Sequence, residues 1–227
     1  MKLLLFPGMD GTGALFAPLI AALPDSIEPV VMTYPVDRRL SYAELIAAAR
    51  TQLPEGEPFL LLGESFGGPI ALQLAAERPE GLAGLVLCCT FARNPHPRFA
   101  PFRSMTGLLP IKEIPSLVSS FVVLGADANE AQRAAFEAAL RKVDSAVLRH
   151  RLREILNVDV CQLLPRIMVP TAYLRATEDR VVPESAVQPF REGIANLEIV
   201  NVPAPHFLLQ TRPAEAAAEI VKLAATV

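Results

Sequence analysis

Ser65 lies at the centre of the segment Gly63-Glu64-Ser65-Phe66-Gly67, which matches the pattern G-x-S-x-G. An apolar run precedes this segment and an Ala- and Leu-rich stretch follows it, so a strand, a sharp turn and a helix are expected. The flanking glycines leave room for a strained turn. The pattern predicts a nucleophilic serine at the head of a helix, whose amides favour developing negative charge. The alternative is an ordinary glycine-rich strand-to-helix turn.

A serine hydroxyl becomes a good nucleophile only beside a base. The chain has three histidines, His96, His150 and His206. His206 follows the last predicted strand, in a loop at the carboxyl edge of the expected sheet, where functional sites gather. We therefore expect His206 to be the base. His96 is expected in an exposed loop, and His150 on a solvated or packed helix face.

The base in turn needs an acid that orients its ring and balances its charge. The loop after residues 171–175 reads ATEDRVVP and contains two carboxylates, Glu178 and Asp179. Asp179 directly precedes Arg180 and two valines, which should anchor the loop in the fold. We expect Asp179 to be the acid, with Glu178 and Asp159 as the alternatives.

Short apolar runs bounded by turn signals recur along the chain, and they do not alternate strictly with polar residues. This pattern is typical of strands covered on both faces, as in a parallel sheet. The runs occupy residues 2–6, 29–34, 59–63, 85–89, 171–175 and 197–202, and helical patterns occupy residues 40–52, 69–77, 185–193 and 215–225. Strands that alternate with helices predict an α/β fold with a mainly parallel sheet of about six strands.

Residues 91–166 interrupt this alternation. They begin with a Pro- and Arg-containing segment and continue with helical patterns at 129–142 and 144–157, without a convincing strand. We expect a helical cap inserted at 91–166 into a core formed by residues 1–90 and 167–227. Apolar side chains of the cap are expected either to line an acyl pocket or to form the core of the cap itself: Phe99, Phe102, Leu108, Leu109 and Phe121.

Composition excludes several classes of protein. The 227 residues are 52% hydrophobic and 20% charged, which excludes a disordered chain, and 21 prolines exclude a coiled coil. A formal net charge of -3 gives no general attraction for nucleic acid. The first residues, MKLLLFPG, predict a core strand rather than a signal peptide, and no apolar stretch is long enough to span a membrane. Three cysteines without a CxxC pair predict reduced thiols in a cytoplasmic protein.

Four segments, FPGMDGTG, GESFGG, ATEDRVVP and PAPHFLLQTRP, occur in this order over nearly the whole chain. Together they resemble the α/β-hydrolase superfamily, and the chain is similar to small bacterial serine esterases and related acyl hydrolases. Ser65, Asp179 and His206 stand in the order found in that superfamily. The resemblance implies a Ser-Asp-His triad and an acyl-enzyme mechanism, with no metal and no cofactor.

The resemblance also implies an oxyanion hole formed by the backbone N–H groups of Phe66 and Met9. The glycine-rich segment that contains Met9 lacks the spacing of a dinucleotide- or phosphate-binding loop. It reads Phe6-Pro7-Gly8 where many members have His-Gly, which leaves the polar bracing of the loop open. Asp10 and Thr12 are expected to brace it by local hydrogen bonds rather than to take part in the chemistry. Because this loop follows the first predicted strand, the leading strands of larger relatives are expected to be missing.

These observations predict an enzyme that cleaves small-molecule carboxylic esters with small or medium acyl chains. A thioesterase or acyltransferase with the same triad is the alternative, and a non-catalytic binding protein of the same fold is the rival class. Arg93, Arg98 and Arg103 lie close together with no acid between them. They are expected to form either a solvated loop or a dock for an acidic substrate or carrier protein.

Overall fold

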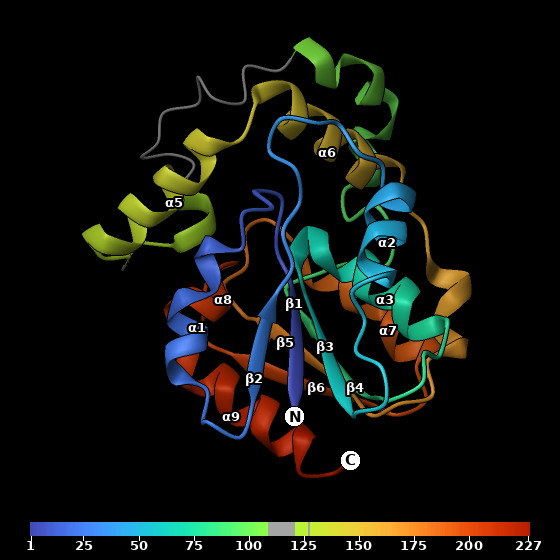
Figure 1. Cartoon of the computed structure of the whole chain (residues 1–227). Helices are drawn as coiled ribbons and strands as arrows, with labels where there is room; N and C mark the ends of the chain where they lie inside the picture. Colours follow the sequence, from blue (N-terminus) through green and yellow to red (C-terminus); the bar gives the residue numbers. More distant parts are fainter. Residues whose placement is uncertain (109–120, 127) are drawn as a thin grey trace.

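The computed structural model describes residues 1–108, 121–126 and 128–227 of the chain (Figure 1). Its centre is a sheet of six parallel strands in the order β2-β1-β3-β4-β5-β6. The strands are β1 (Lys2–Phe6), β2 (Glu28–Val31), β3 (Phe59–Glu64), β4 (Leu82–Cys88), β5 (Thr171–Ala176) and β6 (Leu197–Val202). The predicted mainly parallel sheet of six strands is confirmed.

The apolar runs form strands because both faces of the sheet are covered. Leu4 and Phe6 of β1 point into one apolar core, whereas Leu3 and Leu5 point into the other, and all four are fully buried. Strand β2 ends earlier than expected, because the N–H of Tyr34 donates to the carbonyl oxygen of Gly11, 2.8 Å away. The chain after β2 therefore leaves the sheet and runs along the loop that follows β1.

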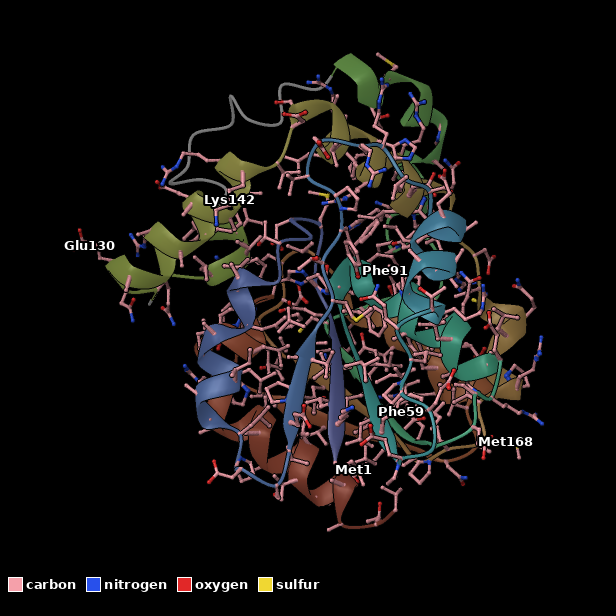
Figure 2. The ribbon with its side chains drawn as sticks, in the orientation of Figure 1. Met1, Phe59, Phe91, Glu130, Lys142 and Met168 are labelled. Atoms are coloured by element: carbon pink, nitrogen blue, oxygen red, sulfur yellow. The ribbon has the colours of Figure 1, made fainter. Side chains whose placement is uncertain are left out.

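Helices pack on both faces of the sheet (Figure 1). On one face lie α2 (Tyr42–Arg50), α3 (Gly68–Ala76) and α7 (Gln188–Gly193), and on the other lie α1 (Ala17–Ala22), α8 (Leu208–Thr211) and α9 (Pro213–Ala224). Short 3₁₀ turns precede three of these helices: η1 (Ala14–Phe16), η2 (Ser65–Gly67) and η5 (Glu184–Val187). Side chains fill the space between the layers, including Phe59 and Phe91, which are buried (Figure 2).

Local capping explains where α2 begins. Ser41 accepts a hydrogen bond from the N–H of Glu44 through its side chain, and the carboxylate of Glu44 accepts one from the N–H of Ser41. This reciprocal pair satisfies two N–H groups that the first turn of a helix leaves open. The helix therefore starts at Tyr42 rather than at Leu40, where the apolar pattern begins.

Residues 91–166 contain helical segments: η3 (Pro97–Leu108), α5 (Glu130–Lys142), α6 (Ser145–Asn157) and η4 (Cys161–Arg166). Among the described residues of this stretch, the only β pairing is an isolated antiparallel bridge between Arg93 and Asp159. Figure 1 shows α5 and α6 beyond the carboxyl ends of the strands. In contrast, Leu164 of η4 is buried in the same core as α3. The division into core and inserted cap stays a prediction.

A search of the described helices for a membrane span, long and apolar enough to cross a bilayer, found none.

Candidate active site

Three residues predicted from the sequence meet at the carboxyl edge of the sheet. The Nε2 atom of His206 lies 3.0 Å from Oγ of Ser65, and its Nδ1 atom lies 2.8 Å from Oδ2 of Asp179. His206 is only 3% exposed. A neutral imidazole with its proton on Nδ1 fits both contacts: Nδ1–H donates to Asp179, and Nε2 accepts from the Ser65 hydroxyl. This arrangement places a base beside a hydroxyl and an acid behind the base.

Ser65 has a positive φ of 49°, the left-handed conformation that L-residues rarely adopt. The turn is tight because backbone groups approach the flanking glycines closely. A Cβ atom on Gly63 would lie 2.7 Å from Cα of Gly68, and one on Gly67 would overlap the carbonyl oxygen of Phe6. The glycines are thus needed for contact between the strands and the helix that follows, and the turn holds Ser65 at the start of α3.

A buried threonine two residues after β4, Thr90, supports the strained turn at Ser65. The hydroxyl of Thr90 donates to the carbonyl oxygen of Ser65 at 2.6 Å. The Thr90 backbone is held in turn by Tyr173 of β5, whose hydroxyl donates to the Thr90 carbonyl oxygen at 2.6 Å. Thr90 is completely buried. This chain of hydrogen bonds links the Ser65 backbone to the strand that carries the Asp179 loop.

The Asp179 carboxylate is fixed by its own loop. Its Oδ1 atom accepts hydrogen bonds from the N–H groups of Val181 and Val182, at 2.7 and 2.8 Å, which leaves Oδ2 directed at His206. Val182 is buried, as expected for a residue that anchors the loop. His96 also contacts this loop, because its Nε2 lies 2.6 Å from the carbonyl oxygen of Val181.

The alternative acids are placed differently. The Asp159 carboxylate accepts a hydrogen bond from the N–H of Cys161 in the turn that starts η4. Glu178 borders a separate cavity, near Pro203 and Arg212. Asp179 is the carboxylate that contacts His206.

The loop after β1 lies directly against Ser65. A Cβ atom on Gly8 would be 3.9 Å from the Cβ of Ser65, which is ordinary contact distance. Asp10 braces the loop, since its Oδ2 accepts from the N–H of Thr12 at 2.9 Å and from the Thr12 hydroxyl at 2.5 Å. Met9 lies between Gly8 and Asp10, so its backbone passes close to the serine. The expected bracing role of Asp10 and Thr12 is confirmed.

Phe66, the residue after the serine, is held rigidly. Its ring is fully buried and stacks on Tyr42, with ring centroids 4.5 Å apart. The hydroxyl of Tyr42 also donates to the carbonyl oxygen of Phe66 at 3.2 Å. Together with the bond from Thr90 to the Ser65 carbonyl oxygen, the Tyr42 bond fixes the peptide groups on both sides of Phe66.

A family model described as the alpha/beta hydrolase family matches residues 3–220. The chain belongs to the alpha/beta hydrolase family. A search of curated proteins found no match.

Solved structures of other alpha/beta hydrolases share the fold at low sequence identity. The enol-lactonase from Burkholderia xenovorans is 17% identical with a TM-score of 0.85, covering 99% of this chain and 91% of that one. A lipase-esterase related protein from Clostridium acetobutylicum is 17% identical with a TM-score of 0.82, covering 98% and 93%. A bromoperoxidase from Bacillus anthracis is 14% identical with a TM-score of 0.81, covering 99% and 91%. At these identities the likeness concerns the fold.

Arg151 of α6 supplies bracing for the Met9 loop that the sequence did not reveal. This buried guanidinium donates from Nη1 to the carbonyl oxygens of Met9 and Asp10, both at 2.9 Å, and from Nη2 to that of Pro35 at 2.8 Å. Burial lowers the pKa of the guanidinium from its ordinary value. The charged side chain of α6 thus takes the bracing place that the Phe6-Pro7-Gly8 sequence leaves open. No local pattern predicts it, because Arg151 is far from the loop in sequence.

A buried carboxyl also lies next to the nucleophile. Glu64 is 4% exposed, and its Oε1 accepts a hydrogen bond from Nε2 of Gln210 at 2.9 Å. Burial raises the pKa of Glu64 to about 7. The x position of G-x-S-x-G therefore carries a titratable group behind Ser65, which the motif alone does not disclose.

The residues predicted to line an acyl pocket lie elsewhere or cannot be placed. Phe99 and Phe121 are 57% and 45% exposed, and neither borders the cavities reported below. The ring of Phe121 lies under the Arg180 guanidinium. Leu109 and the side chains of Phe102 and Leu108 lie outside the described part of the structure.

The predicted basic cluster is only partly described. Arg93 takes part in the backbone bridge with Asp159, Arg98 is exposed, and the side chain of Arg103 is not among those described. A dock for an acidic carrier gains no support from these positions.

An apolar cavity of about 370 Å³ is bordered by α5 and by Phe207. It is bordered by residues that follow the Met9 loop, such as Leu15, and by Phe207, the residue after His206. Its other walls come mainly from the first residues of α1 and α5. The remaining residues that border it are Ala14, Ala17, Pro18, Leu124, Asn129, Ala131, Gln132, Ala135 and Gln210. The hydrolase thus has an apolar cavity whose wall includes the residue that follows its candidate base.

Proposed function

We propose that this alpha/beta hydrolase cleaves carboxylic esters of medium acyl chains through an acyl-enzyme on Ser65. The observation that carries the proposal is the pair of contacts made by His206, one to Ser65 at 3.0 Å and one to Asp179 at 2.8 Å. These distances lie within the hydrogen-bond reach that proton transfer requires. A serine with a base and an orienting acid is the arrangement used for acyl transfer.

In the first half of the reaction, Ser65 attacks the ester carbonyl while Nε2 of His206 takes the hydroxyl proton. Asp179 stabilises the imidazolium through its contact with Nδ1. The N–H groups of Phe66 and Met9 stabilise the oxyanion, aided by the start of α3. His206 then gives its proton to the departing alcohol, and the acyl group remains on Ser65.

In the second half, a water molecule replaces the alcohol. His206 takes a proton from this water as the water attacks the acyl-enzyme. The same N–H groups stabilise the second oxyanion, and the proton returns to Ser65 as the acid leaves. Each group therefore acts twice, which the fixed positions of Asp179 and Phe66 favour.

The apolar cavity of about 370 Å³ is the proposed acyl pocket. It borders Phe207, the residue after His206, and we propose that the acyl chain extends into it from the carbonyl carbon that Ser65 attacks. Its walls are mainly apolar, and burying each methylene of a chain contributes about 0.8 kcal/mol. The account therefore expects affinity to rise with chain length until the cavity is full.

The proposal is tested with p-nitrophenyl esters of increasing acyl length. We expect kcat/KM to rise from acetate to a medium-chain optimum and to fall by at least about 10³-fold in Ser65→Ala. Ser26→Ala, a surface serine, is the matched control and should retain activity. Thioesters with the same acyl groups are assayed alongside. Absence of hydrolysis of any ester by the folded wild-type protein overturns the proposal.

A second pair of variants tests the pocket. Ala135 of α5 borders the cavity, whereas its neighbour Ala134 does not, and both are exposed. Ala135→Phe is expected to lower kcat/KM for medium-chain esters by about tenfold while acetate is unaffected, because the new ring fills space that the chain needs. Ala134→Phe should leave both substrates unchanged. Equal behaviour of the two variants contradicts this location of the pocket.

A further inference from the structure

A cysteine lies close to His206 and Asp179. Cys89 directly follows β4, has a positive φ of 48° and is 2% exposed. Its sulfur, a carboxylate oxygen of Asp179 and a ring nitrogen of His206 all lie within 4.8 Å of one another. Thiolate, imidazole and carboxylate are the three ligand types that zinc prefers in proteins. The proposed catalytic mechanism makes no use of this sulfur.

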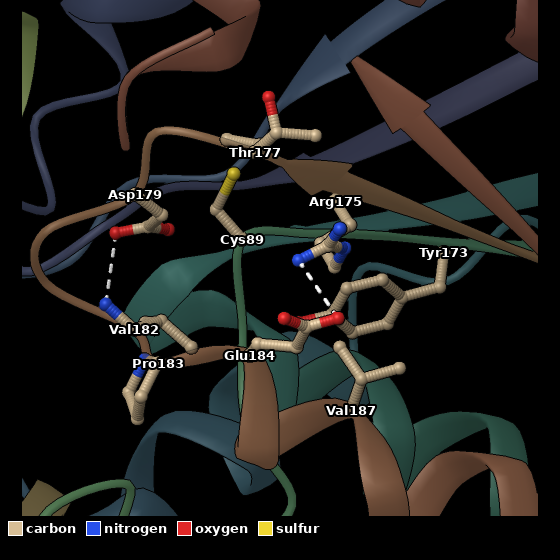
Figure 3. Close-up of a pocket in the computed structure, with 10 residues that line it drawn as sticks. Cys89, Tyr173, Arg175, Thr177, Asp179, Val182, Pro183, Glu184 and Val187 are labelled. Atoms are coloured by element: carbon tan, nitrogen blue, oxygen red, sulfur yellow. Dashed lines mark hydrogen bonds and ion pairs between the residues drawn. The ribbon is translucent and has the colours of Figure 1, made fainter. Parts of the chain in front are cut away.

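A small cavity opens next to the sulfur. It has a volume of about 110 Å³ and is bordered by both Cys89 and Asp179. Figure 3 shows Cys89 between Asp179 and Arg175 in this view. The carboxylates of Asp179 and Glu184 and the guanidinium of Arg175 line the cavity. Glu184 pairs with Arg175 at 3.3 Å. The Arg175 charge is therefore balanced by Glu184, so it does not oppose a cation that displaces the proton between Asp179 and His206.

We infer that Cys89, Asp179 and His206 form an inhibitory site for a soft divalent cation such as zinc or cadmium. Bond lengths of about 2.0–2.3 Å and tetrahedral angles bring ligand atoms to roughly 3.5 Å from one another. Rotation of the Cys89 side chain and small shifts of the Asp179 loop bring the three ligand atoms from within 4.8 Å of one another to this spacing. A water molecule from the cavity completes the four ligands.

The bound ion blocks catalysis through the tautomer of His206, a consequence that rests on the proposed function. The cation binds Nδ1, so the proton on Nδ1 leaves and the neutral ring carries its proton on Nε2 instead. Nε2 then faces Ser65 as a donor and no longer accepts its proton. The Cys89 thiol also loses its proton, so one proton is released to solvent for each ion bound.

The neighbouring cysteine provides a matched control. Sulfur atoms of Cys88 and Cys89 are 3.8 Å apart, yet the three-residue cluster includes only Cys89. Both cysteines are buried, so a serine in either position tests the same kind of change.

The experiment uses Cys161→Ser as the background, which removes the third thiol of the chain. Cadmium is titrated into this protein and into the same protein with Cys89→Ser or Cys88→Ser, and the thiolate-to-cadmium charge-transfer band is recorded. Zinc inhibition of ester hydrolysis is measured on the same samples. We expect the band and the inhibition in the background and in Cys88→Ser, and an at least tenfold higher inhibitory zinc concentration in Cys89→Ser.

Several results overturn the inference. Zinc inhibition that is unchanged in Cys89→Ser contradicts it, and so does a charge-transfer band that is lost in Cys88→Ser but kept in Cys89→Ser. Cys89→Ala is tested as a second variant, with thermal unfolding as the check that both fold. The cadmium band does not depend on activity, so a protein that binds cadmium through Cys89 but cleaves no ester refutes the proposed function and leaves the metal site standing.

Discussion

Nη1 of Arg151 donates to the carbonyl oxygen of Met9 at 2.9 Å, which ties helix α6 to the loop that faces Ser65. The same nitrogen reaches the next carbonyl, that of Asp10, at the same distance. The Met9 carbonyl belongs to the peptide that follows the one carrying the Met9 N–H, so a side chain from residues 145–157 fixes the backbone directly after that N–H. Placement of one proposed oxyanion donor thus depends on α6 and not only on the loop itself.

Arg151→Lys is expected to loosen this loop. A lysine keeps the charge, but its ammonium lacks the planar fork that reaches three carbonyl groups at once. We expect kcat for ester hydrolysis to fall about 10- to 100-fold with a smaller change in KM, and stability to fall by about 2–4 kcal/mol. Arg153→Lys, on the exposed side of the same helix, is the control. Equal kinetics of Arg151→Lys and wild type would contradict a role in orienting Met9.

Asp179→Asn tests the acid. An amide in this place can hold the wrong tautomer of His206, and the corresponding change in serine proteases lowers kcat by about 10⁴-fold. We expect a loss of 10³- to 10⁴-fold here, with little change in thermal stability. Glu178→Gln is the matched control, since it neutralises the adjacent carboxylate without touching His206. A comparable loss in both variants would show that local charge, rather than the Asp179 contact, supports the base.

Thr90→Val removes the hydroxyl that supports the Ser65 backbone. The variant keeps the shape of the side chain but leaves the Ser65 carbonyl without its donor at 2.6 Å. We expect a loss of about 1–3 kcal/mol in the free energy of unfolding together with a lower kcat. Thr171→Val is the control: Thr171 is also buried and bonds to the carbonyl of Val169, at the opposite edge of the sheet.

Urea unfolding and ester kinetics separate these two threonines. Both variants are expected to lose stability, whereas only Thr90→Val should lose activity. If Thr171→Val loses as much kcat as Thr90→Val, the effect is a general one of stability and not of the strained turn.

The pH dependence of stability follows from Glu64. Its pKa is raised to about 7 in the folded protein, against an ordinary value of 4.5, so between these two pH values the folded state holds a proton that the unfolded chain has lost. The free energy of unfolding therefore falls as pH rises through this window and levels off above it. Since one pKa unit corresponds to about 1.4 kcal/mol, the total is on the order of 3 kcal/mol.

Glu64→Gln removes this dependence. Relative to wild type, the variant should become more stable between about pH 5 and pH 8, because it has no carboxyl to ionise in the buried site. Urea unfolding at several pH values gives the comparison, with the exposed Glu80→Gln as control. A constant difference between Glu64→Gln and wild type at every pH would contradict the assignment.

The sequence predicted the Ser65–His206–Asp179 contacts because each residue sits in a local pattern with its own chemical meaning. A glycine-flanked serine after an apolar run indicates a turn, and the loops after two later strands meet it because parallel strands end at one edge. The strands were predictable for the same reason, since their apolar runs are uninterrupted. Strands β2 and β4 were expected too far along the chain. Strand β2 ends at Val31 because Tyr34 bonds to the Met9 loop rather than to a strand, and β4 begins at Leu82, three residues before the apolar run.

Contacts between distant segments could not be predicted in this way. Arg151 looks like any charged residue of an amphipathic helix, and only the packing of α6 over the loop gives it three carbonyl partners. The cavity walls at Leu15, Leu124 and Phe207 come from three separate segments. The aromatic residue types of 91–166 do not by themselves indicate which side chains border a cavity. Phe99 and Phe121, for example, are aromatic but exposed. The chemical roles of single side chains could be predicted from the sequence, but the cavities formed by distant segments could not.

The most direct test of the central claim is the covalent labelling of Ser65. A fluorophosphonate reacts with a serine that an adjacent base activates, and intact-protein mass spectrometry followed by peptide mapping locates the adduct. The account predicts a single adduct on Ser65 in the wild-type protein, none in Ser65→Ala, and much slower labelling in His206→Ala. An adduct that persists in Ser65→Ala, or that maps to another residue, would contradict it.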